Sequence, residues 1–340
     1  MLLREIGRAS QLGIILAAFA PLALPSAAVA ADTYVMKLST ATVNDHQEEW
    51  LKRFAAAVQK DSGGRIKGEV YPSSQLGSIP RQIEGVQFGS IQGWIGPPEF
   101  LVGVDQRYEA LSPPGLFTSE EQATRTDNDP EVRNLMLGLG ANKGLLGVGL
   151  YSVGPSSIDT RKAVRHLADM KGMKIRVLAS PFQLEMIKRL DASPVAMTLA
   201  DVLPAMQQGT IDGTLGTVTI YTTMHYHDAA KYVTEIGQPW ISSMVVLSKK
   251  WVDGLPADLQ KILRDDAASV DKQIGPYAEQ FYFNQRKIWT ERGGELISLP
   301  PDEEKAMLAK ISSVGDDLSK DRPELNKAVK EVFAAAARNK

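Results

Sequence analysis

Arg176 is the residue whose type and position most clearly suggest chemistry. It lies near the end of a short, mostly apolar segment, Lys174–Leu178, whose composition is typical of a strand. Ala179-Ser180-Pro181 then breaks the strand, and a helical pattern begins at Pro181. A guanidinium at a strand end, beside the free amides of a helix start, is well suited to binding an anion. The pattern therefore predicts an anion site that contains Arg176 and Ser180.

The segments around Arg176 alternate between strand and helix. After the helix from Pro181, we expect a strand at 195–197, a helix at 200–208 and a strand at 211–215. A similar set is expected near the start, with strands at 34–39, from 66 and at 90–95, and helices at 46–60 and 80–88. Such alternation predicts parallel sheets with helical crossovers, which bind ligands beyond the carboxyl ends of their strands. Two such sets predict an α/β protein with two similar lobes that face each other.

Other groupings of chemically active residues are weaker. His225 and His227 are the one close histidine pair, and no third metal ligand is evident beside them. Asp127-Asn128-Asp129 has oxygens of the calcium-binding kind but lacks the glycine and distal glutamate of a calcium loop, so we expect a turn and helix cap there. The sequence has no Gly-x-Ser-x-Gly, His-Glu-x-x-His or phosphate-binding loop motif. We expect neither a metal nor a cofactor.

The first 30 residues have the features of a cleaved secretory signal. Arg4 and Arg8 precede an apolar run, and Ala28-Val29-Ala30 matches a signal peptidase site before Ala31. The apolar run is interrupted by prolines and is shorter than the roughly 20 residues that span a bilayer. Removing residues 1–30 from the 340 leaves 310, and the loss of their two arginines and one glutamate changes the net charge from −2 to −3. We expect a soluble periplasmic protein with no affinity for nucleic acid.

The absence of cysteine narrows the possible functions further. With no cysteine in the sequence, disulfides, thiol catalysis and lipid attachment at a signal-end cysteine are excluded. An exported chain of this length is then expected to fold on its apolar core alone, and in two lobes rather than one.

Short motifs along nearly the whole mature chain resemble a known receptor family. In their order they are GGRIKGEVYPSSQLGS (63–78), LADMKGMKIRV (167–177), ASPVAM (192–197), AMQQG (205–209), IDG (211–213), KYV (231–233) and LSKKWVDGLPADLQKIL (247–263). Together they are similar to the solute receptors, of the DctP kind, of tripartite ATP-independent periplasmic (TRAP) transporters. The resemblance implies a two-lobed fold like that of type II periplasmic binding proteins, with hinge strands and a long helix that spans both lobes. The helical pattern from Pro256 to Trp289 is the segment that fits this helix.

The resemblance also gives Arg176 a role and exposes two departures. In the family, the arginine of the KIR motif clamps a substrate carboxylate, so Arg176 is expected to do the same. Many members have a second arginine where this chain has Ser156, and many have Gln-Glu-Asn where it has Thr214-Leu215-Gly216. We therefore expect fewer polar contacts to the ligand, with Gly216 leaving room for a larger or more apolar group. Thr217, next in the chain, belongs to the same predicted site.

Two tryptophans are candidates to fill that room. Trp94 lies in a strand that leads to the crevice between the lobes, and Trp240 lies where the chain enters a crossing strand at 240–248. Their flat apolar faces suit an aromatic or extended organic acid. Packing within the core is an equal alternative for either one.

These observations lead to one predicted function and one alternative. The predicted lobes are residues 31–153 with 242–281, and residues 154–241 with 282–340. The function predicted is a monomeric periplasmic receptor that binds a small organic monocarboxylate, with aromatic acids among the candidates. It would deliver this ligand to the small and large membrane subunits of a TRAP permease. The alternative is an exported α/β enzyme that acts on an organic acid. A receptor for an ATP-driven importer has a similar architecture but different motifs.

Overall fold

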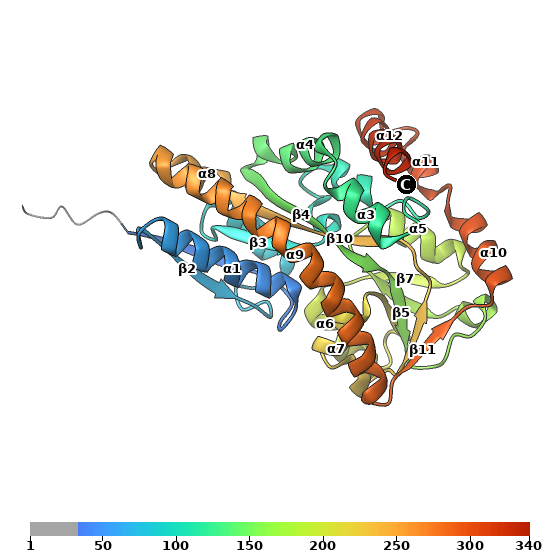
Figure 1. Ribbon diagram of the computed structural model, residues 1–340. Helices are drawn as coiled ribbons and strands as arrows, with labels where there is room; N and C mark the ends of the chain where they lie inside the picture. The colour runs from blue at the N-terminus through green and yellow to red at the C-terminus, as the bar shows by residue number, and fades with distance from the viewer. Residues whose placement is uncertain (1–32) are drawn as a thin grey trace, which may run out of the picture. The chain divides into compact units, whose positions relative to one another are not determined.

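Two β-sheets flanked by helices make up the described part of the chain (Figure 1). The structure is a computed structural model that describes residues 33–340. The predicted signal peptide, residues 1–30, lies outside the described residues. No helix within 33–340 combines the length and the apolar character that crossing a membrane requires.

The first sheet contains the strand–helix set predicted near the start of the chain. Its strand order is β2-β1-β3-β10-β4; β1 is parallel to β2 and β3, and β10 is antiparallel to β3 and β4. The strands are β1 Tyr34–Ser39, β2 Ile66–Tyr71, β3 Gly93–Gly96, β4 Leu145–Pro155 and β10 Trp240–Ser248. The crossover helices are α1, His46–Asp61, and α2, Ile79–Phe88. Asp45 caps α1, because its side chain accepts hydrogen bonds from the backbone N–H groups of Gln47 and Glu48.

The second sheet contains the set around Arg176. Its strand order is β11-β9-β5-β8-β6-β7, and β6 is parallel to both β7 and β8. The strands are β5 Ser157–Thr160, β6 Lys174–Val177, β7 Ser193–Ala196, β8 Gly213–Gly216, β9 Tyr232–Glu235 and β11 Glu295–Ser298. The crossover helices are α5, Pro181–Arg189, and α6, Leu199–Gln208. The predicted order of strands and helices is confirmed, although β7 and β8 are each displaced by about two residues.

Two short segments, which lie side by side, connect the two sheets. The chain leaves β4 for β5 at Ser156, and it returns from β9 to β10 through residues 236–239. Ser156 N–H donates to the carbonyl oxygen of Pro239 at 3.1 Å, and Gly237 N–H donates to that of Ser156 at 3.0 Å. The two connections between the lobes are therefore hydrogen-bonded to each other.

A long helix makes a further connection between the lobes. Helix α9, Ala257–Glu291, follows the short α8, Lys249–Asp253, and Figure 1 shows it passing both sheets. Near its middle, Asp271 accepts hydrogen bonds from Trp50 Nε1 at 2.8 Å and from Leu150 N–H at 2.9 Å. Near its end, Trp289 is fully buried beside Tyr221 of α7, Val218–Thr223. The predicted two-lobed α/β fold with a spanning helix is confirmed.

The last helix lies against elements of the first lobe. In α12, the carbonyl oxygen of Ala336 accepts a hydrogen bond from Gln122 Nε2 at 2.7 Å, and Arg338 pairs with Asp129 at 2.7 Å. The residue limits given above for the two lobes remain a prediction, and α12 was expected in the second lobe. The remaining elements are η1 Pro98–Leu101, η2 Gln106–Leu111, α3 Glu120–Asp127, α4 Pro130–Gly138, η3 Ala141–Lys143, η4 Leu167–Met170, η5 Tyr226–Asp228, α10 Pro301–Ile311, α11 Val314–Ser319 and α12 Pro323–Arg338.

Candidate ligand-binding site

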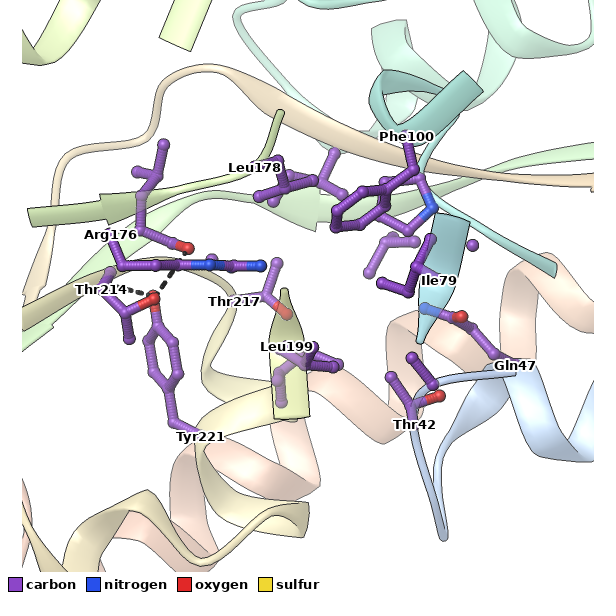
Figure 2. Close-up of a pocket in the computed structure, with 18 of the residues that line it drawn as sticks. Thr42, Gln47, Ile79, Phe100, Arg176, Leu178, Leu199, Thr214, Thr217 and Tyr221 are labelled. Atoms are coloured by element: carbon purple, nitrogen blue, oxygen red, sulfur yellow. Dashed lines mark hydrogen bonds between the residues drawn. The ribbon is translucent and has the colours of Figure 1, made fainter. Parts of the chain in front are cut away.

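A cleft lies where the carboxyl ends of strands from both sheets meet. Its empty volume is about 610 Å³, part of which is open to solvent. Figure 2 shows Thr42, Gln47, Ile79 and Phe100 on one side, and Arg176, Leu178, Leu199, Thr214 and Tyr221 on the other. In the first group, Thr42 follows β1, Phe100 follows β3, and Gln47 and Ile79 lie at the starts of α1 and α2. In the second, Arg176 and Leu178 lie at the end of β6, Leu199 begins α6, Thr214 lies within β8, and Tyr221 lies within α7. This is the position at which open parallel sheets bind ligands.

Arg176 brings a buried positive charge to this cleft. It lies on β6 and is only 2% exposed. Its Nε donates to the carbonyl oxygen of Met197 at 3.0 Å, which orients the guanidinium. Its Nη2 is buried and has no hydrogen-bond partner among residues 33–340. Burial lowers the pKa of the guanidinium from its ordinary value of 12.5, which reflects the free-energy cost of placing this charge away from water.

Two tyrosines lie near the Arg176 side chain. The rings of Tyr221 and Tyr226 are stacked, with centroids 6.0 Å apart, and both lie in the apolar cluster that also contains Trp289. The Tyr221 hydroxyl donates to the carbonyl oxygens of Ser157 at 2.7 Å and Thr214 at 3.1 Å. Burial raises the pKa of both phenols, so both are neutral. The Tyr221 proton is thus committed to the backbone and is not free for a ligand.

A buried carboxyl group, that of Asp159, lies in the same row of the sheet as Arg176. Thr214 is the register partner of both Arg176 on β6 and Asp159 on β5, so the three form a row across the sheet. Neither carboxylate oxygen of Asp159 has a hydrogen-bond partner within the described chain. Burial raises the pKa of Asp159 well above its ordinary value, which favours the neutral form of this carboxyl group. Of these three residues, Arg176 and Thr214 line the cleft, so the side that faces the ligand space carries the positive charge of Arg176.

The ring of Tyr221 lies close beside Gly216. A Cβ added to Gly216 would lie 3.2 Å from Tyr221 Cε1 and 3.3 Å from the Tyr221 hydroxyl oxygen. The sequence analysis expected this glycine to leave room for the ligand. In the structure, the ring of Tyr221 takes up part of the space that a side chain at 216 would need, and the room left for a ligand beside Gly216 stays a prediction.

Four of the seven predicted site residues line the cleft together: Trp94, Arg176, Gly216 and Thr217. Trp94 is also a core residue, since it is 1% exposed and its ring packs over Gly96. Its Nε1 is buried without a partner among residues 33–340. Trp94 therefore packs in the core and also lines the cleft.

Ser156, Ser180 and Trp240 do not line the cleft. Ser156 lies in the hydrogen-bonded crossing between the lobes, and Trp240 begins β10 directly after that crossing. Ser180 caps α5 by accepting from Gln183 N–H, and its hydroxyl donates to Glu109 Oε2 at 3.1 Å. Whether these three residues contact the ligand stays a prediction. The structure shows only the structural roles given above.

Sequence reasoning missed most of the wall contributed by the first lobe. Thr42, Gln47, Ile79 and Phe100 line it, and Gln47 Oε1 accepts from Thr40 Oγ1 at 3.1 Å. The signal was present, because the loop from 40 to 45 follows a strand and precedes a capped helix, as the segment after Arg176 does. Among residues 33–340, no His, Cys, Asp or Glu lines the cleft, so the cleft lacks the side chains that usually bind metals.

A comparison with protein families decides the class of the protein. The model of the DctP family, described as bacterial extracellular solute-binding protein, family 7, matches residues 39–321. The chain belongs to this family. The receptor is therefore a solute-binding protein and not an enzyme, and the resemblance to TRAP solute receptors seen in its motifs is confirmed.

Relatives and solved structures agree with this assignment. The receptor is 27% identical to the 2,3-diketo-L-gulonate-binding periplasmic protein YiaO of Escherichia coli (strain K12), over 85% of its own chain and 88% of that protein. It is 25% identical to the C4-dicarboxylate-binding periplasmic protein DctP of Vibrio cholerae, over 84% of its own chain and 87% of that protein. Its fold matches that of a TRAP periplasmic solute binding protein from Desulfovibrio salexigens, solved with bound orotic acid, with a TM-score of 0.85 at 21% identity. This match covers 91% of the receptor and 100% of that chain.

Proposed function

We propose that this receptor works in the periplasm and binds a small organic acid between its lobes. It then delivers the acid to the small and large membrane subunits of a TRAP permease. Family membership supports the receptor role, and the related proteins named above are periplasmic. The ligands in those names, a diketogulonate, C4-dicarboxylates and orotic acid, all carry a carboxylate.

The single observation that carries the proposal is the unpaired end of Arg176. A buried cation without a counter-ion costs free energy, and a ligand carboxylate would remove that cost. The planar guanidinium presents its nitrogens as a fork that matches two carboxylate oxygens. The Nε atom already donates to the carbonyl oxygen of Met197, whereas Nη2 has no partner among residues 33–340. We therefore expect Nη2 to contact the ligand carboxylate.

We further propose that the preferred ligand is a monocarboxylate with an apolar or aromatic body. Arg176 is the one basic side chain among the described residues that line the cleft, so a second carboxylate would have no opposite charge there. Most of the lining is apolar, with side chains that include Ile79, Trp94, Phe100, Leu178, Leu199 and Ile220. An unpaired carboxylate against such a wall is costly, whereas a flat apolar body buries surface favourably.

A ligand panel tests this proposal. Isothermal titration of the mature chain, residues 31–340, would compare benzoate, cinnamate and orotate with succinate, malate, galactonate and sialic acid. We expect the first three to bind more tightly. A bound ligand at about 100 times its Kd should stabilise the protein by about 2.7 kcal/mol.

Two variants make the panel specific to the cleft. Arg176→Ala should abolish measurable carboxylate binding, whereas Arg125→Ala, which removes an exposed arginine from α3, should leave it unchanged. If Arg176→Ala binds carboxylates with normal affinity, the charged contact lies elsewhere. If succinate or malate competes successfully against all three aromatic acids, the monocarboxylate preference is wrong although the receptor role stands. Monomeric behaviour in sedimentation is expected with and without ligand.

A further inference from the structure

Three potential metal ligands lie together on a turn outside the cleft. His225, His227 and Asp228 each offer one ligand atom, and these atoms all lie within 4.8 Å of one another. The turn follows α7, and its short helix η5 begins at Tyr226. The sequence analysis found no evident third ligand beside the two histidines. In the structure, the carboxylate of Asp228 approaches His227 and supplies that ligand.

The spacing of these atoms fits a tetrahedral cation. Asp228 Oδ1 lies 3.5 Å from His227 Nε2. Two ligands about 2.0–2.1 Å from a tetrahedral Zn²⁺ are separated by about 3.3 Å, so this pair needs almost no movement. His225 is exposed, so its ring can rotate by the small amount that closes the third side. Solvent would complete the coordination.

The backbone brings the two histidine rings together. His225 adopts a left-handed conformation, with φ of 58°, which is uncommon for a residue other than glycine. In this conformation, its ring centroid lies 5.5 Å from that of His227. Such local strain is often found at functional sites, where it holds side chains in place.

Two basic residues, Arg292 and Lys231, lie near His227. The positive charges of Arg292 and Lys231 work against a cation, so we expect moderate rather than tight affinity.

We propose that His225, His227 and Asp228 form a binding site for a borderline-soft divalent cation, for which Zn²⁺ is the probe. Imidazole ligands favour Cu²⁺, Zn²⁺ and Ni²⁺, whereas Mg²⁺ and Ca²⁺ prefer sites made of oxygens alone. The site is separate from the organic-acid cleft, so it stands or falls independently of the proposed ligand. Tyr226, which lies between the two histidines in sequence, is the residue of this turn that lines the cleft.

The test is a zinc titration of tag-free mature protein, because a histidine tag would itself bind the metal. Isothermal titration should show one saturable Zn²⁺ site per chain, with no comparable heat from Mg²⁺. His225→Ala should weaken binding by about tenfold or more, as should Asp228→Asn. Both side chains are exposed, so neither change removes a buried contact. His227→Ala is less informative alone, because the His227 ring packs edge-on against Trp289 at 6.1 Å.

A matched control is available in the same chain. His166 is exposed and pairs with Glu303 at 2.8 Å, far in sequence from the turn. His166→Ala should leave zinc affinity unchanged. An absence of saturable zinc binding, or zinc affinity that is unchanged in both His225→Ala and Asp228→Asn, would overturn the proposal, as would a loss of binding in His166→Ala. Anomalous diffraction at the zinc edge from soaked crystals should place the metal within the turn, and a peak elsewhere would also contradict it.

Discussion

The ring of Tyr221 lies close beside Gly216, with Tyr221 Cε1 3.2 Å from where a Cβ at position 216 would lie. Tyr221 cannot easily withdraw, because its hydroxyl is bonded to two carbonyl groups and its ring is stacked on Tyr226. The two positions therefore form a coupled pair. Any change at one is expected to be felt by the other.

Gly216→Ala should accordingly destabilise the protein. Overpacking of this kind costs about 1–3 kcal/mol in the free energy of unfolding. Urea unfolding followed by circular dichroism would measure it. Tyr221→Ala combined with Gly216→Ala should be less destabilised than the sum of the two single variants.

Gly103→Ala is the matched control, since a Cβ at that position meets nothing within 4 Å. If the changes in the free energy of unfolding for Gly216→Ala and Tyr221→Ala simply add in the double variant, the Tyr221 ring is not what opposes a side chain at position 216.

Arg176→Met should give a protein that is more stable without ligand but unable to bind carboxylates. Methionine roughly keeps the volume while it removes a buried charge whose Nη2 lacks a partner. The loss of the bond from Nε to Met197 costs about 1 kcal/mol, which the relieved desolvation should exceed. Urea unfolding in a buffer without carboxylates measures the stability, and calorimetry measures the binding. A variant that is destabilised and still binds would mean that Arg176 is a structural residue.

The stability of the receptor should fall as pH rises from 5 to 8. Burial, and then the charge of Glu99, raise the pKa of Glu109 from 4.5 to about 8. The folded protein therefore keeps a proton that the unfolded chain releases above its ordinary value. The contribution of Glu109 to the free energy of unfolding is fully present below about pH 4.5. It is lost as the pH rises through the pKa that this group has in the folded protein, by at most about 1.4 kcal/mol per pH unit for each such proton.

Glu109→Gln tests this pH dependence, because glutamine keeps an acceptor for the Ser180 hydroxyl but does not titrate. Urea unfolding at pH 5, 6, 7 and 8 should give a shallower slope for this variant than for the unmodified protein. Glu84→Gln, at an exposed position on α2, should leave the slope as it is. Parallel slopes for all three proteins would contradict the assignment to Glu109.

Ligand binding should change the fluorescence of Trp94 and not that of Trp240. Trp94 lines the cleft, whereas Trp240 begins β10 outside it. In titrations with a bound acid, Trp94→Phe should lose most of the change in emission and Trp240→Phe should retain it. The reverse pattern would mean that the ligand lies near the crossing between the lobes.

Local structure near Arg176 could be predicted from the sequence because its signals are local. Pro181 begins α5 and Gly209 ends α6, as their preferred backbone geometries require. The strand β7 between these two helices, and the position of Arg176 near the end of the preceding strand β6, then follow from the alternation of strands and helices. The resemblance to a receptor family added the function of that arginine.

The far wall and the partner of Gly216 could not be predicted in the same way. A glycine indicates that space is needed but not which residue uses it, and Tyr221 reaches it only because α7 folds back over β8. Gln47 and Phe100 line the same cleft as Arg176, and no spacing in the sequence indicates that these residues share one site. Similarly, α12 returns to α3 and α4 through contacts between residues about 200 positions apart, such as Arg338 with Asp129.

The strand order has a consequence for how this chain reaches its folded form. The first sheet has β10 between β3 and β4, so its middle is missing until residue 248 has been made, and the second sheet lacks its β11 edge until residue 298. Neither half can close while the ribosome is still producing the first two-thirds of the polypeptide. Pairings between residues so far apart also form slowly. Closure of both sheets is therefore a late event in the synthesis of this chain.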